Sequence, residues 1–440
     1  MSLRPPPKVE KLQGVLRAKA KENPSYRFYA LYDKVHREDV LAWAYERCRR
    51  NAGAPGVDGQ TFEDIEAYGR ERWLGELAQE LKEKKYRPEA VKRVWIPKGD
   101  GKERPLGIPT IRDRVVQMAA VLVMEPIFDA DLQPEQHAYR PDHSAHKALR
   151  EVQSWLDRGY TEVVDADLSG YFDSIPHHEL MQSVARRISD RHLLHLVKMW
   201  LEAPVEETDE RGRTERTTRN KDEGRGTPQG GVASPLLANL YMRRFVLGWK
   251  VNGHEERLQA RIVNYADDFV ICCRPGKADE AMRVMRQMME KLRLTVNEKK
   301  TRQCQLPEET FRFLGFTFGA QVSWKTGRRY IAPAPAESKV SGVCKKISEL
   351  TSAQTTWRAE EDQVARLNQV LTGWGNYFCL GYVTGAWHTV QQHTCRRLRR
   401  WLRRKHGQAG GHQGYPDMQL YEKYGLVNLR REINRSSLWA

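Results

Sequence analysis

Two adjacent carboxylates, Asp267 and Asp268, interrupt a stretch of sequence that otherwise has the pattern of two buried strands. The apolar segments Ala260 to Val263 and Phe269 to Cys273 lie on either side of them. Adjacent carboxylates repel each other and lose solvation when partly buried, so this turn needs a compensating cation. A hard divalent ion such as magnesium suits oxygen ligands of this kind. Taken alone the pair is weak evidence, because most Asp-Asp pairs are solvated turn residues.

A second acidic strand lies earlier in the chain. Between Val163 and Leu168, apolar residues alternate with Asp165 and Asp167, which places both carboxylates on one face of a strand. If this strand neighbours the Asp267 turn, one of its carboxylates can complete a site for two metal ions about 4 Å apart, as phosphoryl transfer requires. Spacing alone leaves open which of the two aspartates takes that place.

Composition narrows the class of partner. The 440 residues include 73 Lys and Arg against 57 Asp and Glu, a formal net charge of +16, which favours a polyanion. An anionic membrane surface is the weaker alternative, because the sequence has no long apolar window and no signal-peptide core at its start. The 7 cysteines include no Cys-x-x-Cys pair and are interpreted as reduced thiols of a cytosolic protein.

Periodicity predicts an α/β region followed by an all-helical one. Strands at Val91 to Pro97 and Arg104 to Ile108 form a β-hairpin with a basic rim, and Ala281 to Leu292 has the pattern of a helix on a sheet. The polar segment Glu206 to Gly226 is expected to be an exposed, mobile hairpin insertion. Ala332 to Pro335 is interpreted as a short stiff linker to the helical region.

A polybasic helix is predicted near the end of the chain. Seven of the ten residues from 396 to 405 are basic, and they surround nearly the full circumference of a helix. Some of them must face a phosphate backbone or repel one another strongly. They are Arg396, Arg397, Arg399, Arg400, Arg403, Arg404 and Lys405.

Three ordered motifs resemble those of group II intron reverse transcriptases. They are Asp167-Leu168-Ser169-Gly170-Tyr171-Phe172-Asp173, the block from Gly226-Thr227-Pro228-Gln229-Gly230-Gly231 to Leu240, and Tyr265-Ala266-Asp267-Asp268. Further matches are Gly56-Val57-Asp58-Gly59, Arg104 to Pro109, Ala138-Tyr139-Arg140-Pro141, Val296 to Lys300 and Phe313-Leu314-Gly315-Phe316. The resemblance covers residues 50 to 435, nearly the whole chain.

The resemblance implies an α/β (α+β) right-hand polymerase with fingers, a palm and an all-helical C-terminal thumb. The thumb, called domain X in maturases, is suggested by the segment from Leu367 to Phe378. We expect an N-terminal extension at 1–55, fingers and palm at 56–330, the thumb at 331–405 and a short basic tail at 406–440. The tail is a candidate remnant of a DNA-binding region.

The resemblance also assigns the catalytic residues. The family's catalytic aspartate lies five residues before an aromatic side chain that screens the sugar, which fits Asp167 and Phe172. Asp167, Asp267 and Asp268, with Leu168 beside the first, are therefore expected to hold two magnesium ions. Asp165 becomes a neighbouring or exposed carboxylate, and Asp173 a turn cap.

The remaining contacts are assigned in the same way. The resemblance places Lys98 and Arg104 on the triphosphate, although both have the alternative of being solvated rim charges. Phe172 would exclude the ribonucleotide 2′-hydroxyl, unless it is an ordinary core residue, and Gln229 would lie near the sugar and base. Gly230 and Gly231 would let the backbone approach the primer–template. Arg396, Arg397, Arg400, Arg403 and Arg404 are expected on nucleic acid.

The expected activity is RNA-directed DNA polymerisation, with an RNA template, a DNA or RNA primer and a group II intron RNA as partners. A host-domesticated enzyme of repair or phage defence and a maturase acting mainly as an RNA-binding splicing factor are the alternatives. No Cys pair follows Cys395, so the zinc-supported endonuclease of many relatives is not expected. The sequence leaves a monomer or a dimer open.

Overall fold

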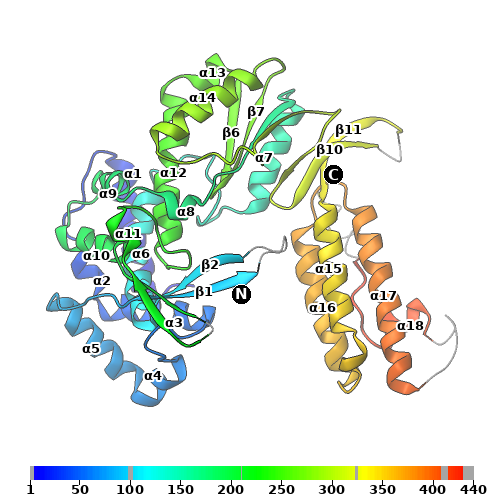
Figure 1. The fold of residues 1–440 in the computed structure, drawn as a ribbon, viewed down its shortest axis with the longest axis horizontal. Coiled ribbons are helices and arrows are strands. Elements are labelled where there is room, and N and C mark those ends of the chain that lie inside the picture. The colour runs from blue at the N-terminus through cyan, green and yellow to red at the C-terminus, as the bar shows by residue number, and fades with distance from the viewer. Residues whose placement is uncertain (1–3, 98–102, 210, 323–325, 408–414, 430–440) are drawn as a thin grey trace.

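The molecule consists of an α/β body and a separate group of helices, joined through a small sheet (Figure 1). The structure is a computed structural model that describes residues 4–97, 103–209, 211–322, 326–407 and 415–429. The helical group begins directly after strand β11 (Arg329–Pro335) and runs away from the body. The α/β region and the all-helical region therefore follow each other in the order that periodicity predicted.

The central sheet of the palm is antiparallel and has the strand order β6-β7-β3-β8. Strand β7 is a nearly continuous buried apolar run, because both faces of the sheet are covered, whereas the edge strand β8 buries only Cys304. Helices α12 (Ser234–Val251) and α14 (Ala278–Lys291) cover one face, and α7 (Ala145–Asp157) covers the other. The strands are β3 (Glu162–Ala166), β6 (Ala260–Tyr265), β7 (Asp268–Cys273) and β8 (Arg302–Gln305).

The fingers sheet has the order β2-β1-β4-β5. Its hairpin β1 (Val91–Pro97) and β2 (Glu103–Ile108) has the predicted bounds within one residue. The polar segment expected as a mobile insertion does form a hairpin, β4 (Val205–Thr208) and β5 (Thr214–Thr217), but it is part of the sheet. Strand β4 pairs in parallel with β1 through Val91 and Val205.

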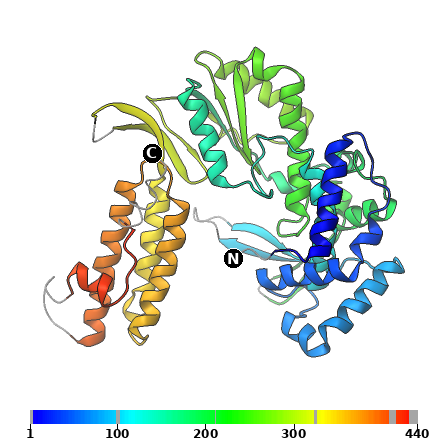
Figure 2. The ribbon, with the colours of Figure 1, turned by 180° about the vertical axis from the view of Figure 1, so that it is seen from behind.

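The N-terminal extension shares the core of the body. Helices α1 (Pro7–Glu22) and α3 (Glu38–Asn51) pack on α6 (Ile111–Asp129), which is buried over almost its entire surface. Figure 2 shows α1 lying along the back of the body. The other helices of the body are α2 (Tyr32–Val35), α4 (Phe62–Tyr68), α5 (Arg70–Lys82), α8 (Tyr171–Ser174), α9 (His177–Ala185), α10 (Arg191–Leu201), α11 (Arg219–Asp222) and α13 (His254–Arg257).

A third sheet connects the body with the helices. It has the order β11-β10-β9, with β9 (Phe311–Phe313) and β10 (Phe316–Val322). The stiff linker expected at Ala332 to Pro335 is wrong, because these residues belong to β11 and pair with β10 from Gly319 to Phe316. Strand β11 is an edge strand, where proline is tolerated although it lacks a backbone N–H.

The helical domain has its own hydrophobic core, built from α15 (Glu337–Leu350), α16 (Glu360–Tyr377), α17 (Thr384–His406) and α18 (Asp417–Glu422). The side chains of Tyr415, Leu420, Leu426 and Leu429 are buried in the same core. The domain therefore extends past the boundary expected at residue 405, and the described part of the expected tail packs against it.

The joint between the two parts predicts a stability difference between two glycines. Gly381 has a φ of +72°, and a Cβ there would collide with the carbonyl oxygen of Pro333 in β11. Gly381→Ala should lower the free energy of unfolding by about 1–3 kcal/mol, because the strained backbone and the close approach both reject a side chain. The measurement is thermal or urea unfolding of the purified protein.

Gly385 in α17 provides the matched control, because a Cβ there meets nothing within 4 Å. Gly385→Ala should leave stability unchanged or raise it by up to about 1 kcal/mol. Equal stabilities of the two variants would contradict the packing of Gly381 against β11.

Candidate functional site

The acidic turn joins β6 and β7 at the end of the palm sheet. Tyr265 pairs with Asp268, and Ala266 takes a left-handed conformation with a φ of 58° to close the turn. Its carbonyl accepts a hydrogen bond of 2.8 Å from the buried amide of Asn264. Asp267 and Asp268 are exposed, whereas the strand residues on either side of the turn are buried. The sheet thus presents two carboxylates at its edge.

Strand β3 brings Asp167 to the same edge. Ala166 is the last residue of β3 and pairs with Phe269 of β7, so the chain continues past Asp268 as it leaves the sheet. Protein atoms packed around the carboxyl, and then the charges of Asp267 and Asp167, raise the pKa of Asp268 to about 6. The three carboxylates expected at the catalytic centre therefore lie close enough to affect one another.

Asp167 is held by the segment that follows α14. Its carboxylate accepts a hydrogen bond of 2.8 Å from the amide of Asn297 and lies 3.3 Å from the ammonium of Lys300. The backbone N–H of Asn297 also donates to the Asp167 carbonyl oxygen at 2.8 Å. Residues 296–300 match a motif of the family, but the sequence alone did not indicate their contact with Asp167. Leu168, expected at the metal site, is buried and forms a bridge with Val296.

Asp165 lies on the same strand but has a different partner. Its carboxylate lies 3.7 Å from the guanidinium of Arg302 in the neighbouring strand β8. Burial is the largest effect on this carboxyl and raises its pKa to about 6, although Arg302 acts in the opposite direction. The charge of Asp167 adds to the increase. The two aspartates therefore differ in their partners, because Asp165 lies beside Arg302 and Asp167 beside Asn297 and Lys300. Their spacing in the sequence did not distinguish them.

Three of the four residues expected around the nucleotide lie in the described part of the chain. Phe172 is half-buried and packs edge-on against Tyr171, with ring centroids 5.7 Å apart. The amide of Gln229 donates to the Asp173 carboxylate at 3.2 Å, so Asp173 binds this glutamine. Arg104 is exposed on β2, opposite Ile96. Lys98 lies outside the described residues.

The glycines of the Pro-Gln-Gly block are explained by contacts within the protein. Gly230 has a φ of +107°, and a Cβ on it would collide with the carbonyl oxygen of Gly107 in the fingers. A Cβ on Gly231 would lie 2.7 Å from the hydroxyl of Ser234. The backbone N–H of Gly107 donates to the Gln229 carbonyl at 2.5 Å. These contacts alone explain why glycine occupies both positions, without a primer–template lying close to the backbone.

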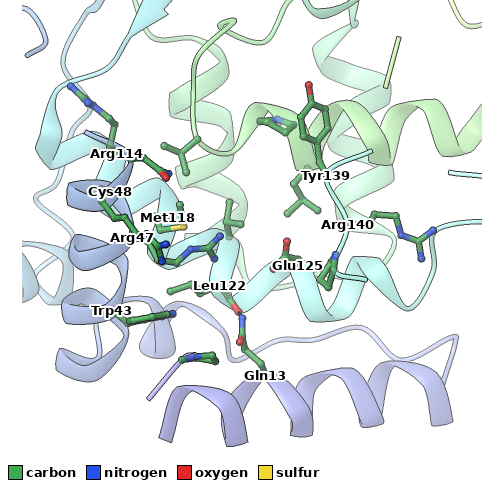
Figure 3. A pocket seen from close by; sticks show the side chains of 18 of the residues that line it. Gln13, Trp43, Arg47, Cys48, Arg114, Met118, Leu122, Glu125, Tyr139 and Arg140 are labelled. Carbon is green, nitrogen blue, oxygen red and sulfur yellow. Dashed lines mark hydrogen bonds between the residues drawn. The ribbon is translucent and has the colours of Figure 1, made fainter. Parts of the chain in front are cut away.

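A cavity of about 1320 Å³ adjoins the acidic turn, with Gly230 and Tyr265 in its lining. The N-terminal helices and α6 form the opposite wall, and Figure 3 shows Arg47 and Arg114 on one side of the pocket and Tyr139 and Arg140 on the other. Cationic and aromatic side chains in one cavity suit a polyanionic ligand with planar groups. The other lining residues include Trp43, Arg50, Met118 and His143.

Tyr377 of the helical domain reaches the acidic turn. The Tyr377 hydroxyl donates to the Leu314 carbonyl at 2.9 Å. The backbone carbonyl oxygen of Tyr377 lies 2.7 Å from a ring nitrogen of His146 in α7. Burial, and then the charges of Tyr265 and Asp268, raise the pKa of Tyr377. The sequence placed Tyr377 only within the thumb segment Leu367 to Phe378, whereas the structure shows that it connects the helical domain to α7 and to the third sheet.

The arginines of α17 divide into two groups. The Arg397 guanidinium donates to the Ser348 carbonyl at 2.8 Å and to the Thr351 hydroxyl at 2.9 Å, so it closes the end of α15. Arg399 donates to the Tyr415 carbonyl at 2.6 Å. The expectation that Arg397 faces nucleic acid is therefore not supported by its contacts. Arg403 is half-buried, and the exposed arginines are Arg396, Arg400 and Arg404.

The described residues contain neither a compact cluster of metal-binding side chains nor a membrane-spanning helix. Among them no three His, Cys, Asp or Glu side chains are arranged closely enough to hold a metal ion. No helix in the described ranges is long and apolar enough to cross a membrane. The seven cysteines are free thiols, and Cys48, Cys272, Cys273, Cys304 and Cys395 are buried.

Comparison with known proteins gives two family matches. Residues 96–318 match the family "Reverse transcriptase (RNA-dependent DNA polymerase)". Residues 340–415 match "Group II intron, maturase-specific domain". The second match begins within α15 and ends where the described chain resumes at Tyr415. Together they cover the α/β body from the fingers hairpin onward and most of the helical domain.

Individual relatives agree with these matches. Protein YkfC of Escherichia coli (strain K12) is 33% identical over 367 residues, which cover 75% of this chain and 93% of that protein. Group II intron-encoded protein LtrA of Lactococcus lactis subsp. cremoris is 32% identical over 241 residues, or 54% of this chain and 38% of LtrA. A solved structure, "Partial Cas6-RT-Cas1--Cas2 complex", overlaps 60% of this chain and 41% of that chain at 21% identity, but its TM-score of 0.34 carries no weight. The chain belongs to the reverse transcriptase family of RNA-dependent DNA polymerases and carries the maturase-specific domain of group II intron proteins.

Proposed function

We propose that this reverse transcriptase extends a DNA or RNA primer on an RNA template at Asp167, Asp267 and Asp268. The observation that supports the proposal best is the mutual influence of these carboxylates, which lie at the ends of two paired strands. Two carboxylates come from one turn and the third from a strand that is distant in sequence. Burial, and then the charges of Asp267 and Asp167, raise the pKa of Asp268, and a carboxyl perturbed in this way favours a functional role.

Two magnesium ions are proposed at these carboxylates, which, as they stand in the described part of the chain, are not grouped closely enough to hold a metal ion. Oxygen ligands of this kind suit magnesium, and a cation would relieve the repulsion that raises the pKa of Asp268. Asp167, Asp267 and Asp268 would hold the ions, with the backbone of Leu168 beside them. Such ions supply activation of the primer 3′-hydroxyl and neutralisation of charge on the departing pyrophosphate.

The surrounding residues of this chain orient the reactants. Asn297 and Lys300 hold the Asp167 carboxylate in place, and Lys300 gives it a positive neighbour before substrate binds. Arg104 on the fingers hairpin is proposed to bind the triphosphate, together with Lys98. Phe172 would occupy the space that a ribose 2′-hydroxyl requires, and Gln229 would lie beside the sugar. The cationic cavity next to Tyr265 suits the nucleic acid backbone.

The direct test substitutes two aspartates separately: Asp167, which follows the end of β3, and Asp165, which lies within that strand. Asp167→Asn should slow primer extension on the order of a thousandfold, equivalent to about 4 kcal/mol, because the amide cannot supply a negatively charged ligand. Template affinity should stay near that of the unmodified protein. Extension of a labelled primer with dNTPs and magnesium measures the rate, and fluorescence anisotropy measures the affinity.

Asp165→Asn is the matched control, because its carboxylate pairs with Arg302 and is not assigned to the metal site. The control should retain most of the extension activity. Normal polymerisation by the Asp167→Asn variant, or equal losses in both variants, would contradict the assignment of Asp167.

The buried charge of Asp165 also predicts a pH-dependent stability. The folded protein raises the pKa of Asp165 to about 6, compared with about 3.9 in an unfolded chain. The folded state therefore binds this proton more tightly, and its stability falls as pH rises from about 4 through 6. Asp165→Asn removes that loss.

In EDTA, the melting temperature of Asp165→Asn should exceed that of the unmodified protein at pH 7.5, and the two should converge near pH 4. A thermal unfolding series across this range tests the expectation. A difference between the two proteins that is constant with pH would show that ionisation of Asp165 is not its cause.

We further propose that the helical domain binds group II intron RNA and assists splicing and mobility. The maturase-specific match and the exposed row Arg396, Arg400 and Arg404 support this role. The alternatives are a host-domesticated enzyme and a purely RNA-binding splicing factor. The convergence of three carboxylates argues against a protein that only binds RNA. A monomer and a dimer are both compatible with these roles.

Two neighbouring arginines separate RNA contact from domain stability. Arg400→Ala should weaken binding of an intron transcript and reduce the salt dependence of the affinity by about one phosphate contact, because Arg400 is exposed. Arg397→Ala should instead lower the melting temperature, because its guanidinium closes the end of α15. Filter binding at several salt concentrations and thermal unfolding distinguish the two. Equal effects of both substitutions on the salt dependence would contradict the division of α17.

A further inference from the structure

One large aromatic side chain is exposed at the end of the helical domain that lies farthest from the palm. Trp357 is 78% exposed, in the connection between α15 and α16. This connection lies at the free lower end of the domain in Figure 1. An indole exposed to this extent contributes little to the hydrophobic core, and its flat ring is accessible to a ligand.

The turn that carries Trp357 is held firmly. The backbone N–H of Arg358 donates to the Thr355 carbonyl at 3.2 Å, which closes the turn around the tryptophan. The hydroxyl of Thr355 donates to the Leu350 carbonyl at 2.9 Å and accepts from the indole N–H of Trp401 at 3.0 Å. Trp357 is therefore presented by a pre-organised backbone, which limits the entropy lost when a ligand binds.

Helix α17 connects this turn to the exposed arginines. The ammonium of Lys405 donates to the Thr356 carbonyl at 3.3 Å and to the Arg358 carbonyl at 2.8 Å. Arg397, Trp401 and Lys405 are spaced by four residues, so one row of α17 faces the α15 end and the turn. The neighbouring row is exposed and basic, and consists of Arg396, Arg400 and Arg404.

The charges around the indole favour one path for a bound strand over the surface of the domain. The acidic residues nearby, Glu360 to Asp362, form the first turn of α16, and Glu360 is paired with His406 at 2.6 Å. The cations lie on α17, where the exposed row from Arg396 to Arg404 spans about 12 Å at the rise of an α-helix. The guanidinium of Arg358 lies 5.5 Å from the indole centroid. A polyanion would be attracted along α17 and repelled from the start of α16.

We propose that Trp357 stacks on an unpaired base of an RNA strand whose phosphates follow Arg404, Arg400 and Arg396. A planar exposed ring next to a row of cations is the arrangement with which proteins bind single-stranded nucleic acid without reading its sequence. A duplex keeps its bases stacked internally and offers the indole no face. The inference rests on the proposed RNA binding by the helical domain, and it adds that this site selects unpaired nucleotides.

The test compares Trp357→Ala and Trp357→Phe with the unmodified full-length protein. The probes are a short unstructured RNA strand and a blunt RNA duplex of equal length, each labelled for fluorescence anisotropy. Trp357→Ala should weaken binding of the single strand by about 5- to 100-fold, the loss typical of one stacked base. Binding of the duplex should be nearly unchanged, and Trp357→Phe should retain most of the single-strand affinity.

Salt dependence separates stacking from ion pairing. Trp357→Ala should leave the slope of log affinity against log salt unchanged, whereas Arg400→Ala should reduce it by about 0.7 for one phosphate contact on a single strand. Tyr29→Ala is the control for a general loss of surface aromatics, because Tyr29 is 71% exposed in the N-terminal extension. This control should bind both probes as the unmodified protein does.

Several results would overturn the inference. One is an unchanged single-strand affinity of Trp357→Ala, and another is an equal loss of affinity for the duplex. A third is that the unmodified protein sediments as a dimer and Trp357→Ala as a monomer, which would show that Trp357 contacts a second copy of the chain. Primer extension on a short template keeps the two proposals apart. An unmodified protein that binds the single strand but does not extend primers would contradict the polymerase proposal alone, whereas an unmodified protein that extends primers while Trp357→Ala keeps full single-strand affinity would contradict only the stacking proposal.

Discussion

Repulsion among carboxylates at one edge of the palm sheet is the constraint on which the rest of the site depends. Asp268 lies next to Asp267 in the chain and near Asp167 through strand pairing, and burial, followed by the charges of these two residues, raises its pKa to about 6. The protein holds this arrangement with buried strands on both sides of the turn and with Lys300 and Asn297 on Asp167. Binding of cations is what would make such crowding favourable.

The fold and the convergence of the acidic strand on the acidic turn were predictable because their signals are local, whereas the catalytic role of these carboxylates stays a prediction. Apolar runs around the acidic turn indicated paired strands, and the ordered motifs implied the reverse transcriptase fold, which the family match confirms. Asp165 and Asp167 could be separated only with the family pattern, because strand alternation treats them alike. Arg302 and Asn297, which distinguish them in the structure, come from segments whose packing the sequence does not reveal.

The errors arose where tertiary contacts decide. Ala332 to Pro335 reads as a linker by composition, but an edge strand tolerates its prolines. The approach of a primer–template to Gly230 stays a prediction, but the carbonyl oxygen of Gly107 in the fingers also excludes a side chain there, which the sequence did not indicate. Arg397 and Arg400 are equivalent in sequence, and only the position of α15 shows that the first supports the domain and the second is exposed.

Metal binding by the assembled site tests the central claim most directly. Electron paramagnetic resonance can count the Mn²⁺ ions taken up by the protein with a chain-terminated primer, an RNA template and the next dNTP. The account predicts two ions per site in the unmodified protein and loss of uptake in Asp268→Asn. Undiminished uptake by that variant would show that the crowded carboxylates do not bind the ions.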